Sequence, residues 1–341
     1  MSEPKIALLQ TRNLTERMFT EETLARMRKL GQVIINPNRE RPTVEETIEL
    51  IEGAQACVTS WGCQPMTAQV LDAAPDLGII VYAAGSVKPI VTDAVWSRGI
   101  TVTSSAAMIA VNVAEMTMGC LILGLKNAWG LSRATRSGSW REEREYAKSR
   151  VLNQATVGII SASHVGRKVL EYLRAFEVKE ILLYDPYWSV DEISELGAAK
   201  VSLEELLQRS DAVTLHAPAL PATRHMLGTE ELRLMKDDAV LVNTSRGQNI
   251  DQQALIAELE EGRLFAFIDV TDPEPPAVDS PLRALPNVVL TPHVAGGGAN
   301  PRLGDHAFEE LRRFFAGEPP LHEVTRDMLA HIACPHLIAR A

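Results

Sequence analysis

The alternation of short apolar runs with amphipathic stretches is the feature of this sequence that most restricts its fold. Runs such as 157–160, 181–184 and 240–243 are rich in Val, Ile and Leu, and longer stretches of helical periodicity separate them. Strands have this composition when helices cover both faces of a parallel sheet. The pattern therefore predicts an α/β protein built from doubly wound parallel sheets.

The runs fall into two groups, so we expect two sheets in two domains. The first group predicts a flavodoxin-like sheet, with strands near 6–10, 33–36, 56–60, 79–83 and 101–103. The second predicts a Rossmann sheet of six parallel strands, near 157–161, 181–185, 212–216, 240–244, 267–270 and 288–291. A long apolar helix near 108–125 separates the groups, and a polar arm near 133–150 follows that helix.

The end of the chain predicts a discontinuous first domain. A glycine-rich loop at 296–298 leads into an amphipathic helix near 303–315, which can return the chain to the first sheet. We therefore expect one domain of residues 1–104 and 297–341 and a second of residues 105–296.

Charge and cysteine usage exclude several classes of partner. Lys and Arg number 34 against 44 Asp and Glu, a net charge of −10 without a basic block, so neither nucleic acid nor a membrane surface is expected as a partner. We find no signal segment and no apolar run of transmembrane length. Cys57, Cys63, Cys120 and Cys334 lack metal-ligand spacing, so we expect no metal and a reducing, cytoplasmic location.

One segment occupies the place of a dinucleotide-binding turn. Between a predicted strand and a helix, the positions of a G-x-G-x-x-G fingerprint read Ser161, Ser163 and Gly166. Only Gly166, which allows the helix to pack closely on the strand, keeps the pattern. Ser163 places a Cβ where pyrophosphate normally meets bare backbone, although its hydroxyl can donate to phosphate. On this segment alone, a cofactor site and an ordinary βα turn are equally open.

Asp185 strengthens the cofactor hypothesis. It ends the next predicted strand, 19 residues beyond Gly166. An acid at this place accepts hydrogen bonds from the adenosine ribose and repels a 2′-phosphate, which favours NAD over NADP. The alternative is an aspartate that begins a turn before Pro186.

Three later strand ends supply an arginine, a carboxylate and a histidine. Arg246, Glu274 and His293 each follow a different predicted strand, and such strand ends converge on the crevice where α/β proteins bind ligands. Arginine can hold a carboxylate bidentately, histidine can exchange a proton near neutral pH, and glutamate can tune that histidine. The set predicts reduction of a 2-keto acid. Singly, each residue has a structural alternative: a surface arginine, an acidic turn or a satisfied histidine.

These motifs, taken in order, resemble the D-isomer-specific 2-hydroxyacid dehydrogenase family, which includes phosphoglycerate, glyoxylate/hydroxypyruvate and formate dehydrogenases. The resemblance covers nearly the whole chain. It is strongest in Val157-Gly158-Ile159-Ile160, Leu183-Tyr184-Asp185-Pro186, Leu215-His216-Ala217-Pro218, Asn243-Thr244-Ser245-Arg246-Gly247, Ile268-Asp269-Val270 and Thr291-Pro292-His293-Val294-Ala295-Gly296.

The resemblance implies a role for each site residue. Arg246 would orient the substrate, Glu274 would pair with the histidine, and His293 would be the acid/base. Residues 105–296 would bind NAD, and the other domain would bind the substrate through the loop Ala84-Gly85-Ser86. The implied cofactor contacts are Ser163, His164, Val165, Asp185, His216, Ala217, Pro218, Thr244, Ser245, Arg246, Asp269 and His293. The family also implies a homodimer, with 108–150 as the natural interface.

The chain departs from the family pattern at three informative places. Ile109 stands where the family usually has an asparagine, six residues before Glu115. Trp61 stands where phosphoglycerate dehydrogenases carry an arginine, so we expect an unphosphorylated substrate. Glu274 stands where formate dehydrogenases have glutamine, which argues against that activity.

Two functions follow from these observations. The leading hypothesis is an NAD-dependent dehydrogenase for a small, unphosphorylated D-2-hydroxy acid or 2-keto acid, because all three chemical groups are present. The alternative is an NAD(H)-sensing regulatory protein of the same fold without significant turnover, suggested by Ser161, Ser163 and Ile109.

Overall fold

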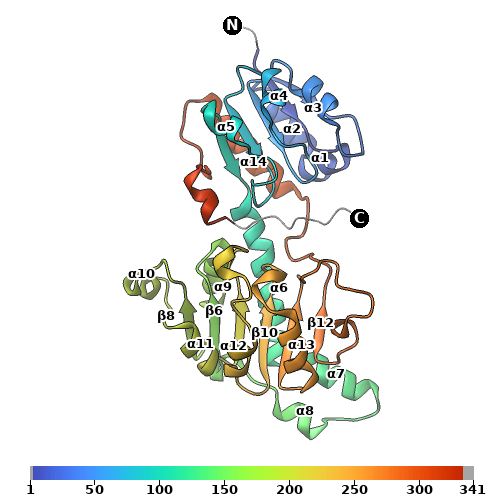
Figure 1. Ribbon diagram of the computed structural model, residues 1–341, viewed down its shortest axis with the longest axis vertical. Coiled ribbons are helices and arrows are strands. Elements are labelled where there is room, and N and C mark those ends of the chain that lie inside the picture. The colour runs from blue at the N-terminus through green and yellow to red at the C-terminus, as the bar shows by residue number, and fades with distance from the viewer. Residues whose placement is uncertain (1–2, 333–341) are drawn as a thin grey trace. The chain divides into compact units, whose positions relative to one another are not determined.

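The computed structural model describes residues 3–332, and Cys334 lies outside them. Packing divides the chain into two compact units, each with its own parallel sheet (Figure 1). Unit 1 runs to Ile109 and resumes at Gly297, and unit 2 comprises Ala110–Gly296. The first boundary therefore falls inside a helix, five residues after the expected boundary at residue 104.

The sheet of unit 1 has five parallel strands in the order β2-β1-β3-β4-β5, which is the flavodoxin-like order. The strands are β1 (Lys5–Leu8), β2 (Gln32–Ile35), β3 (Ala56–Thr59), β4 (Ile79–Tyr82) and β5 (Thr101–Ser104). A segment near the chain's end borders β5, because the amide of Val324 donates to Val102 O and Thr103 forms an antiparallel bridge with Glu323.

Helices cover both faces of this sheet because successive strand side chains alternate between two cores. In one core, Ala7, Cys57 and Ile80 pack against α3 (Val44–Ile51), α4 (Ala68–Asp72) and α5 (Asp93–Ser97). In the other, Ile6 and Val58 pack against the remaining helices of the unit, which are α1 (Arg12–Met18), α2 (Glu21–Met27) and α14 (Pro301–Phe315).

Unit 2 has a seven-stranded parallel sheet in the order β12-β11-β10-β9-β6-β7-β8. This is the Rossmann order with one additional strand at an edge. The strands are β6 (Thr156–Ile160), β7 (Glu180–Tyr184), β8 (Ala199–Lys200), β9 (Ala212–Leu215), β10 (Ala239–Asn243), β11 (Leu264–Ile268) and β12 (Val288–Leu290). The strand order reverses between the neighbouring strands β6 and β9: β7 and β8 follow on the side of β6, and β10, β11 and β12 follow on the side of β9.

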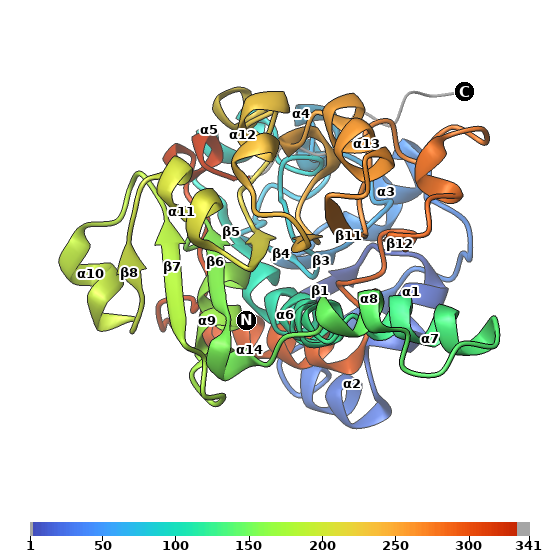
Figure 2. The same ribbon diagram turned by 90° about the horizontal axis from the view of Figure 1, so that it is seen from below.

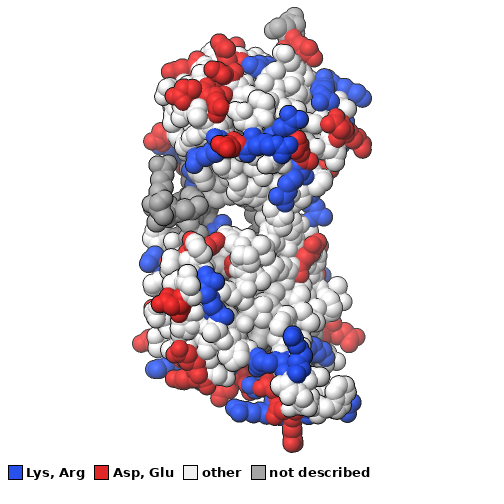
Figure 3. Space-filling model, turned by 90° about the vertical axis from the view of Figure 1, so that its right-hand side faces the viewer, with Lys and Arg blue, Asp and Glu red and all other residues white. Residues whose placement is uncertain are grey.

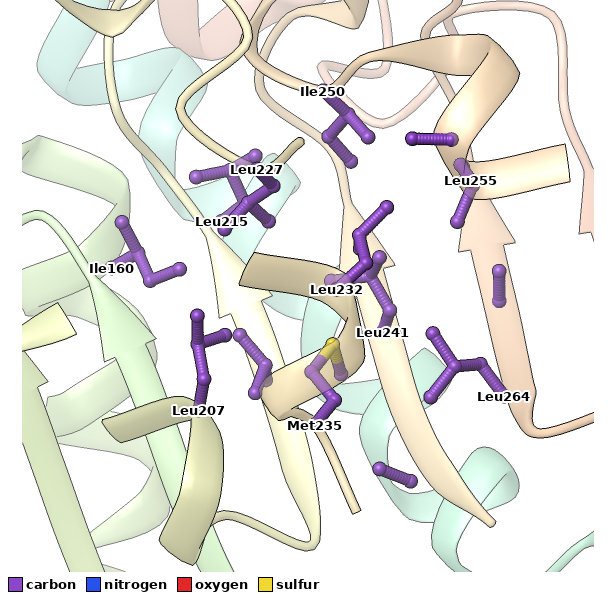
Figure 4. Packing of buried hydrophobic residues seen from close by; sticks show 14 of the residues in the cluster. Ile160, Leu207, Leu215, Leu227, Leu232, Met235, Leu241, Ile250, Leu255 and Leu264 are labelled. Atoms are coloured by element: carbon purple, nitrogen blue, oxygen red, sulfur yellow. The ribbon is translucent and has the colours of Figure 1, made fainter. Parts of the chain in front are cut away.

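Two apolar cores hold the helices of unit 2 on its sheet. Ile160, Leu215 and Leu241 pack with α11 (Leu203–Arg209), α12 (Thr229–Leu234) and α13 (Gln252–Glu260), as Figure 4 shows from close by. Alternate residues of the same strands pack with α6 (Ala106–Leu125) and α9 (His164–Leu173), which lie on the opposite side of the sheet in Figure 2. The edge helix is α10 (Val190–Glu195).

One helix of the described residues, α6, is long and apolar enough to cross a membrane by length and composition. The sequence-based expectation that no such apolar segment exists was therefore wrong. Ala114, Met118, Leu121 and Leu125 of this helix belong to the core of unit 2, so its composition is that of a helix packed on a sheet.

The expected arm contains two short helices, α7 (Ala128–Arg136) and α8 (Glu143–Ala147). Trp140 lies between them and is 80% exposed. The remaining short helical turns are η1 (Leu152–Gln154), η2 (Pro221–Thr223), η3 (Gly247–Asn249), η4 (Pro281–Arg283) and η5 (Asp327–Ala330).

Candidate functional site

The carboxyl edge of the unit 2 sheet collects the chemical groups that the sequence singled out. His216 follows β9, Arg246 follows β10, Glu274 lies in the loop after β11, and His293 follows β12. These four strands are consecutive neighbours in the sheet. Because parallel strands end at the same edge, the four side chains are delivered to one side of unit 2.

His293 and Glu274 form a direct pair. The Nδ1 atom of His293 lies 2.6 Å from Oε1 of Glu274, and the two side chains are 41% and 26% exposed. The histidine is thus accessible, although a carboxylate holds one of its ring nitrogens. With Nδ1 engaged, Nε2 is the ring atom that can exchange a proton with a ligand.

Asp269 holds the turn that carries His293. Its carboxylate accepts hydrogen bonds from the Thr291 hydroxyl at 2.6 Å and from the amides of Val294 and Ala295, both at 2.9 Å. His293 itself has a φ of +52°, in the left-handed region, and its amide donates to the carbonyl of Asp269. The geometry shows that this aspartate fixes the chain on both sides of the histidine, and the cofactor contact implied by the family resemblance stays a prediction.

The loop after β10 places Arg246 beside Glu274. Burial lowers the pKa of Arg246, and the negative charge of Glu274 opposes this effect. Nη1 donates to the carbonyl of Ser245 at 2.6 Å, which leaves other guanidinium donors for a ligand. Asn243 stabilises the loop by accepting from Ser245 and donating to the carbonyl of Arg246.

Gly247 allows the loops after β10 and β11 to meet. A Cβ at this position would lie 2.1 Å from the carbonyl carbon of Thr271 and 2.7 Å from the amide nitrogen of Asp272. No side chain fits there, because both neighbouring atoms belong to backbone. The glycine therefore brings the segment with Arg246 against the segment that leads to Glu274.

The turn after β6 keeps the shape of a dinucleotide-binding loop despite its serines. Ser161 has a φ of +80°, a backbone conformation suited to glycine. A Cβ on Gly166 would lie 2.0 Å from the carbonyl oxygen of Ser161, so the first turn of α9 packs directly on this loop. Ser163 caps α9 by accepting from the amide of Gly166 at 3.3 Å. The loop therefore leads into the N-terminus of a ten-residue helix, which favours an anion.

Asp185 is tied to the same loop. Its carboxylate accepts from the amide of Ala162 at 2.8 Å and from the amide of Tyr187 at 2.9 Å, and the residue is 5% exposed. Each carboxylate oxygen has a second lone pair for a hydroxyl ligand. Arg167 lies nearby and donates to the carbonyl of Ala162.

His216 is suited to a buried binding role and not to acid/base chemistry. Burial lowers its pKa to about 3. Nε2 lies 2.8 Å from the hydroxyl of Thr214, while Nδ1 is buried and has no hydrogen-bond partner among residues 3–332. Ala217 and Pro218 follow it, and Asn249 donates to Ala217 O at 2.7 Å.

This buried nitrogen and the close turn at Gly166 fit a bound dinucleotide. The turn supplies a helix N-terminus without an intervening side chain at Gly166. Nδ1 of His216 is a buried polar atom without a hydrogen-bond partner in the described residues, and a bound ligand could supply one. Thr244, which follows the neighbouring β10, is already bonded to Thr117 of α6 at 2.9 Å. The contact between the two threonines holds α6 against the strand end.

Unit 1 contains the loop Ala84-Gly85-Ser86, which follows β4. The Ser104 hydroxyl donates to Gly85 O at 2.6 Å, and the amide of Ser105 donates to Ala84 O at 3.1 Å. The loop is therefore held through its carbonyls. Ile109, the residue in place of the expected asparagine, packs within the core of this unit.

Several features of the site were not visible in the sequence. The partners of Asp269 are mostly backbone amides, and Asn249 and Thr117 belong to no motif that we recognised. Three cysteines of the described residues are buried: burial raises the pKa of Cys63 to about 11 and that of Cys120 to about 12, and the pKa of Cys57 shifts upward as well. None of these three thiols is activated as a nucleophile.

Comparisons with known proteins agree with the architecture. The family model "D-isomer specific 2-hydroxyacid dehydrogenase, NAD binding domain" matches residues 118–295. A glyoxylate reductase of Korarchaeum cryptofilum is 33% identical over 329 residues, which cover 94% of this chain and 98% of that protein. A D-3-phosphoglycerate dehydrogenase of Methanocaldococcus jannaschii is 32% identical over 302 residues, 87% of this chain but 56% of that longer protein.

A solved structure shows the same fold over nearly the whole chain. A protein from Thermus thermophilus superposes with a TM-score of 0.75 at 29% identity, and the match covers 94% of this chain and 100% of that one.

Proposed function

We propose that this chain, which belongs to the D-isomer specific 2-hydroxyacid dehydrogenase family, interconverts a small, unphosphorylated 2-keto acid and the corresponding D-2-hydroxy acid with NAD(H). Membership makes the protein an NAD-binding oxidoreductase that acts on CH–OH donors. The observation that carries the finer proposal is the pairing of His293 with Glu274 beside the partly buried Arg246.

His293 is assigned the proton transfer. In reduction, Nε2 holds the proton that passes to the oxygen of the keto group, because Nδ1 is bonded to Glu274. Glu274 keeps the ring oriented and stabilises the imidazolium that forms when the reaction runs in the other direction. Asp269 is a positioning residue, since its carboxylate holds the backbone around His293.

Arg246 is assigned the substrate carboxylate. A guanidinium offers several donors in a planar fork, so it can bind a carboxylate and polarise the neighbouring carbonyl. The backbone amides of Ala84, Gly85 and Ser86 in unit 1 are proposed as substrate-binding groups. Trp61, 38% exposed, lies in the loop after β3 and offers no charge for a phosphate, so an unphosphorylated substrate is favoured.

Bound NADH supplies the hydride for this reaction. The residues proposed to hold the dinucleotide come from the strand ends of unit 2. Asp185 is proposed to bind the adenosine ribose, and its charge favours NAD over NADP. The other proposed contacts are Ser163, His164 and Val165 at the start of α9, then His216, Ala217 and Pro218, and finally Thr244, Ser245, Arg246, Asp269 and His293.

The test is NADH consumption by the purified protein with glyoxylate, hydroxypyruvate, pyruvate and 3-phosphohydroxypyruvate, with NADPH in parallel. We expect turnover with an unphosphorylated acid, a preference for NADH, and a loss of about 10²–10⁴-fold in kcat for His293→Ala. Equal rates for wild type and His293→Ala would refute the assignment of His293. Tight NADH binding without turnover across the panel would instead favour an NAD(H)-sensing regulator.

A homodimer and a cytoplasmic location complete the proposal. The exposed Trp140 and Tyr146 of the arm are 80% and 61% accessible, and large exposed aromatic side chains are enriched at interfaces. Figure 3 shows one face of the molecule with acidic and basic side chains interspersed, which agrees with a lack of affinity for nucleic acid. Size-exclusion chromatography with light scattering would measure the molar mass in solution. The mass of a single chain would refute the dimer.

A further inference from the structure

Three metal-ligand side chains meet in unit 1, and none of them is among the residues assigned a role above. His306 and Glu310 are four residues apart in α14, so they lie on the same face of that helix. His322 comes from the segment that follows α14 and borders β5. His306 and Glu310 are buried, and the side chain of His322 is 30% exposed.

The donor atoms of these side chains converge on one point. Nε2 of His306 lies 2.9 Å from Nδ1 of His322 and 3.2 Å from Oε1 of Glu310, and the last two atoms are 3.5 Å apart. A tetrahedral Zn²⁺ ion with bonds of about 2.0–2.1 Å holds its ligand atoms about 3.3 Å from one another. The three distances therefore match the face of a zinc coordination tetrahedron.

The neighbours of the cluster support this arrangement. The hydroxyl of Ser105, just before α6, lies 2.8 Å from Nδ1 of His306, so it can accept a hydrogen bond from Nδ1–H and leave Nε2 for a metal. The backbone amides of Leu321 and His322 donate to the Glu310 carboxylate at 3.0 and 2.9 Å and fix its orientation.

We propose that His306, Glu310 and His322 bind one Zn²⁺ ion, with water in the fourth position. The bound ion stabilises unit 1, because it joins the segment at His322 to α14. That segment in turn covers the edge strand β5, since the Ser104 amide donates to His322 O and the Val324 amide donates to Val102 O. The site requires no enzymatic turnover and stands independently of the proposed function.

The experiment uses the full chain, stripped with EDTA and dialysed, and titrated with ZnCl₂ in a calorimeter and in a thermal melt. We expect one zinc at this site and a Tm that rises with zinc concentration. His322→Asn should weaken zinc binding by about ten-fold or more, because a ligand is lost. His225→Asn is the matched control, since His225 is exposed and lies in unit 2.

Two further readouts keep the test decisive. Co²⁺ in place of zinc should give the visible absorption of a tetrahedral site, which His322→Asn should abolish. His293→Ala identifies any zinc held by the His293–Glu274 pair and should leave the site on α14 intact. Absence of zinc binding, or equal affinity in wild type and His322→Asn, would overturn the proposal and leave the cluster as a hydrogen-bonded network.

Discussion

Glu274 acts on two neighbouring side chains at once, His293 and Arg246. Its carboxylate contacts Nδ1 of His293 at 2.6 Å, and its charge also favours the protonated form of the partly buried Arg246. A neutral amide at this position retains the shape but removes the charge. The histidine ring would then be held less firmly, and the protonated form of Arg246 would be less stable.

Glu274→Gln is therefore expected to lower kcat for 2-keto acid reduction by about 10–100-fold, the effect typical of a residue that acts through another. Steady-state kinetics at saturating NADH would measure it. Asp279→Asn, an exposed change in the same loop, is the control and should leave kcat unaltered. An unchanged kcat for Glu274→Gln would contradict the role of the pair.

Ser161 has a strained backbone, because it stands at the first position of the G-x-G-x-x-G pattern, where glycine is usual. Its φ of +80° belongs to the region that glycine adopts freely, and its amide donates to Tyr184 O at 2.8 Å. A side chain in this conformation costs on the order of 1 kcal/mol. The chain tolerates this strain where the first fingerprint glycine would stand.

Ser161→Gly should raise the free energy of unfolding by about 1 kcal/mol and tighten NADH binding, because the backbone strain in the loop before α9 is removed. Urea unfolding and NADH fluorescence would measure the two effects. Ser137→Gly, at an ordinary φ of −85°, should bring neither gain. Lower stability for Ser161→Gly would show that the serine makes a compensating contact.

At the scale of elements, close loop contacts determine the site more than the strands do. The strands set where each loop begins, but Gly247 allows the loop with Arg246 to touch Thr271 and Asp272. Asp269 then joins the end of β11 to the turn after β12. A change that separates these loops would separate Arg246 from Glu274.

Gly247→Ala is expected to destabilise the protein by about 1–3 kcal/mol through overpacking and to lower kcat as the loops move apart. Gly119→Ala is the matched control, because a Cβ there meets nothing within 4 Å and alanine is the better helix former in α6. Thermal unfolding should show a lower Tm for the first variant and a higher Tm for the second. Two equal shifts would refute the close-approach argument.

The periodicity of the sequence predicted most elements but not all of their positions. The five strands of unit 1 were expected within one or two residues of their observed bounds, because each is a short buried run. β11 begins at Leu264, three residues before the expected 267–270. The short helices α1 and α5 were missed, because seven or five residues carry little periodic signal.

At the scale of the whole molecule, the free energy of unfolding depends on pH because burial keeps some titratable side chains neutral. Burial holds the pKa of His216 at about 3, below its ordinary value of 6.5. The unfolded chain therefore binds a proton that the folded chain does not. The contribution of this group to the free energy of unfolding is fully present above pH 6.5 and decreases as the pH falls toward 3.

His216→Gln should make the free energy of unfolding fall less steeply as the pH is lowered, because the residue that takes up the proton on unfolding is gone. Urea midpoints between pH 6.5 and 4 would measure the slope. His225→Asn, which removes an exposed histidine, should retain the slope of the wild type. An identical slope for His216→Gln would contradict a buried neutral histidine.

Tertiary packing decides which groups of the molecule could be predicted from the sequence and which could not. His293, Glu274 and Arg246 were predicted because each follows a recognisable strand. The cluster of His306, Glu310 and His322 was not predicted, since His322 lies in a segment without a motif and meets α14 only through tertiary packing. The hold of Asp269 on the backbone around His293 was equally invisible, because main-chain amides leave no trace in a sequence.

The most direct test of the central claim compares a single turnover of enzyme-bound NADH in wild type and His293→Ala. The best 2-keto acid from the panel would be mixed with each protein at matched NADH occupancy. We predict that both proteins bind NADH with similar affinity, while the rate of NADH oxidation falls about 10²–10⁴-fold in the variant. An unchanged rate at equal occupancy would contradict His293 as the proton donor and the account built on it.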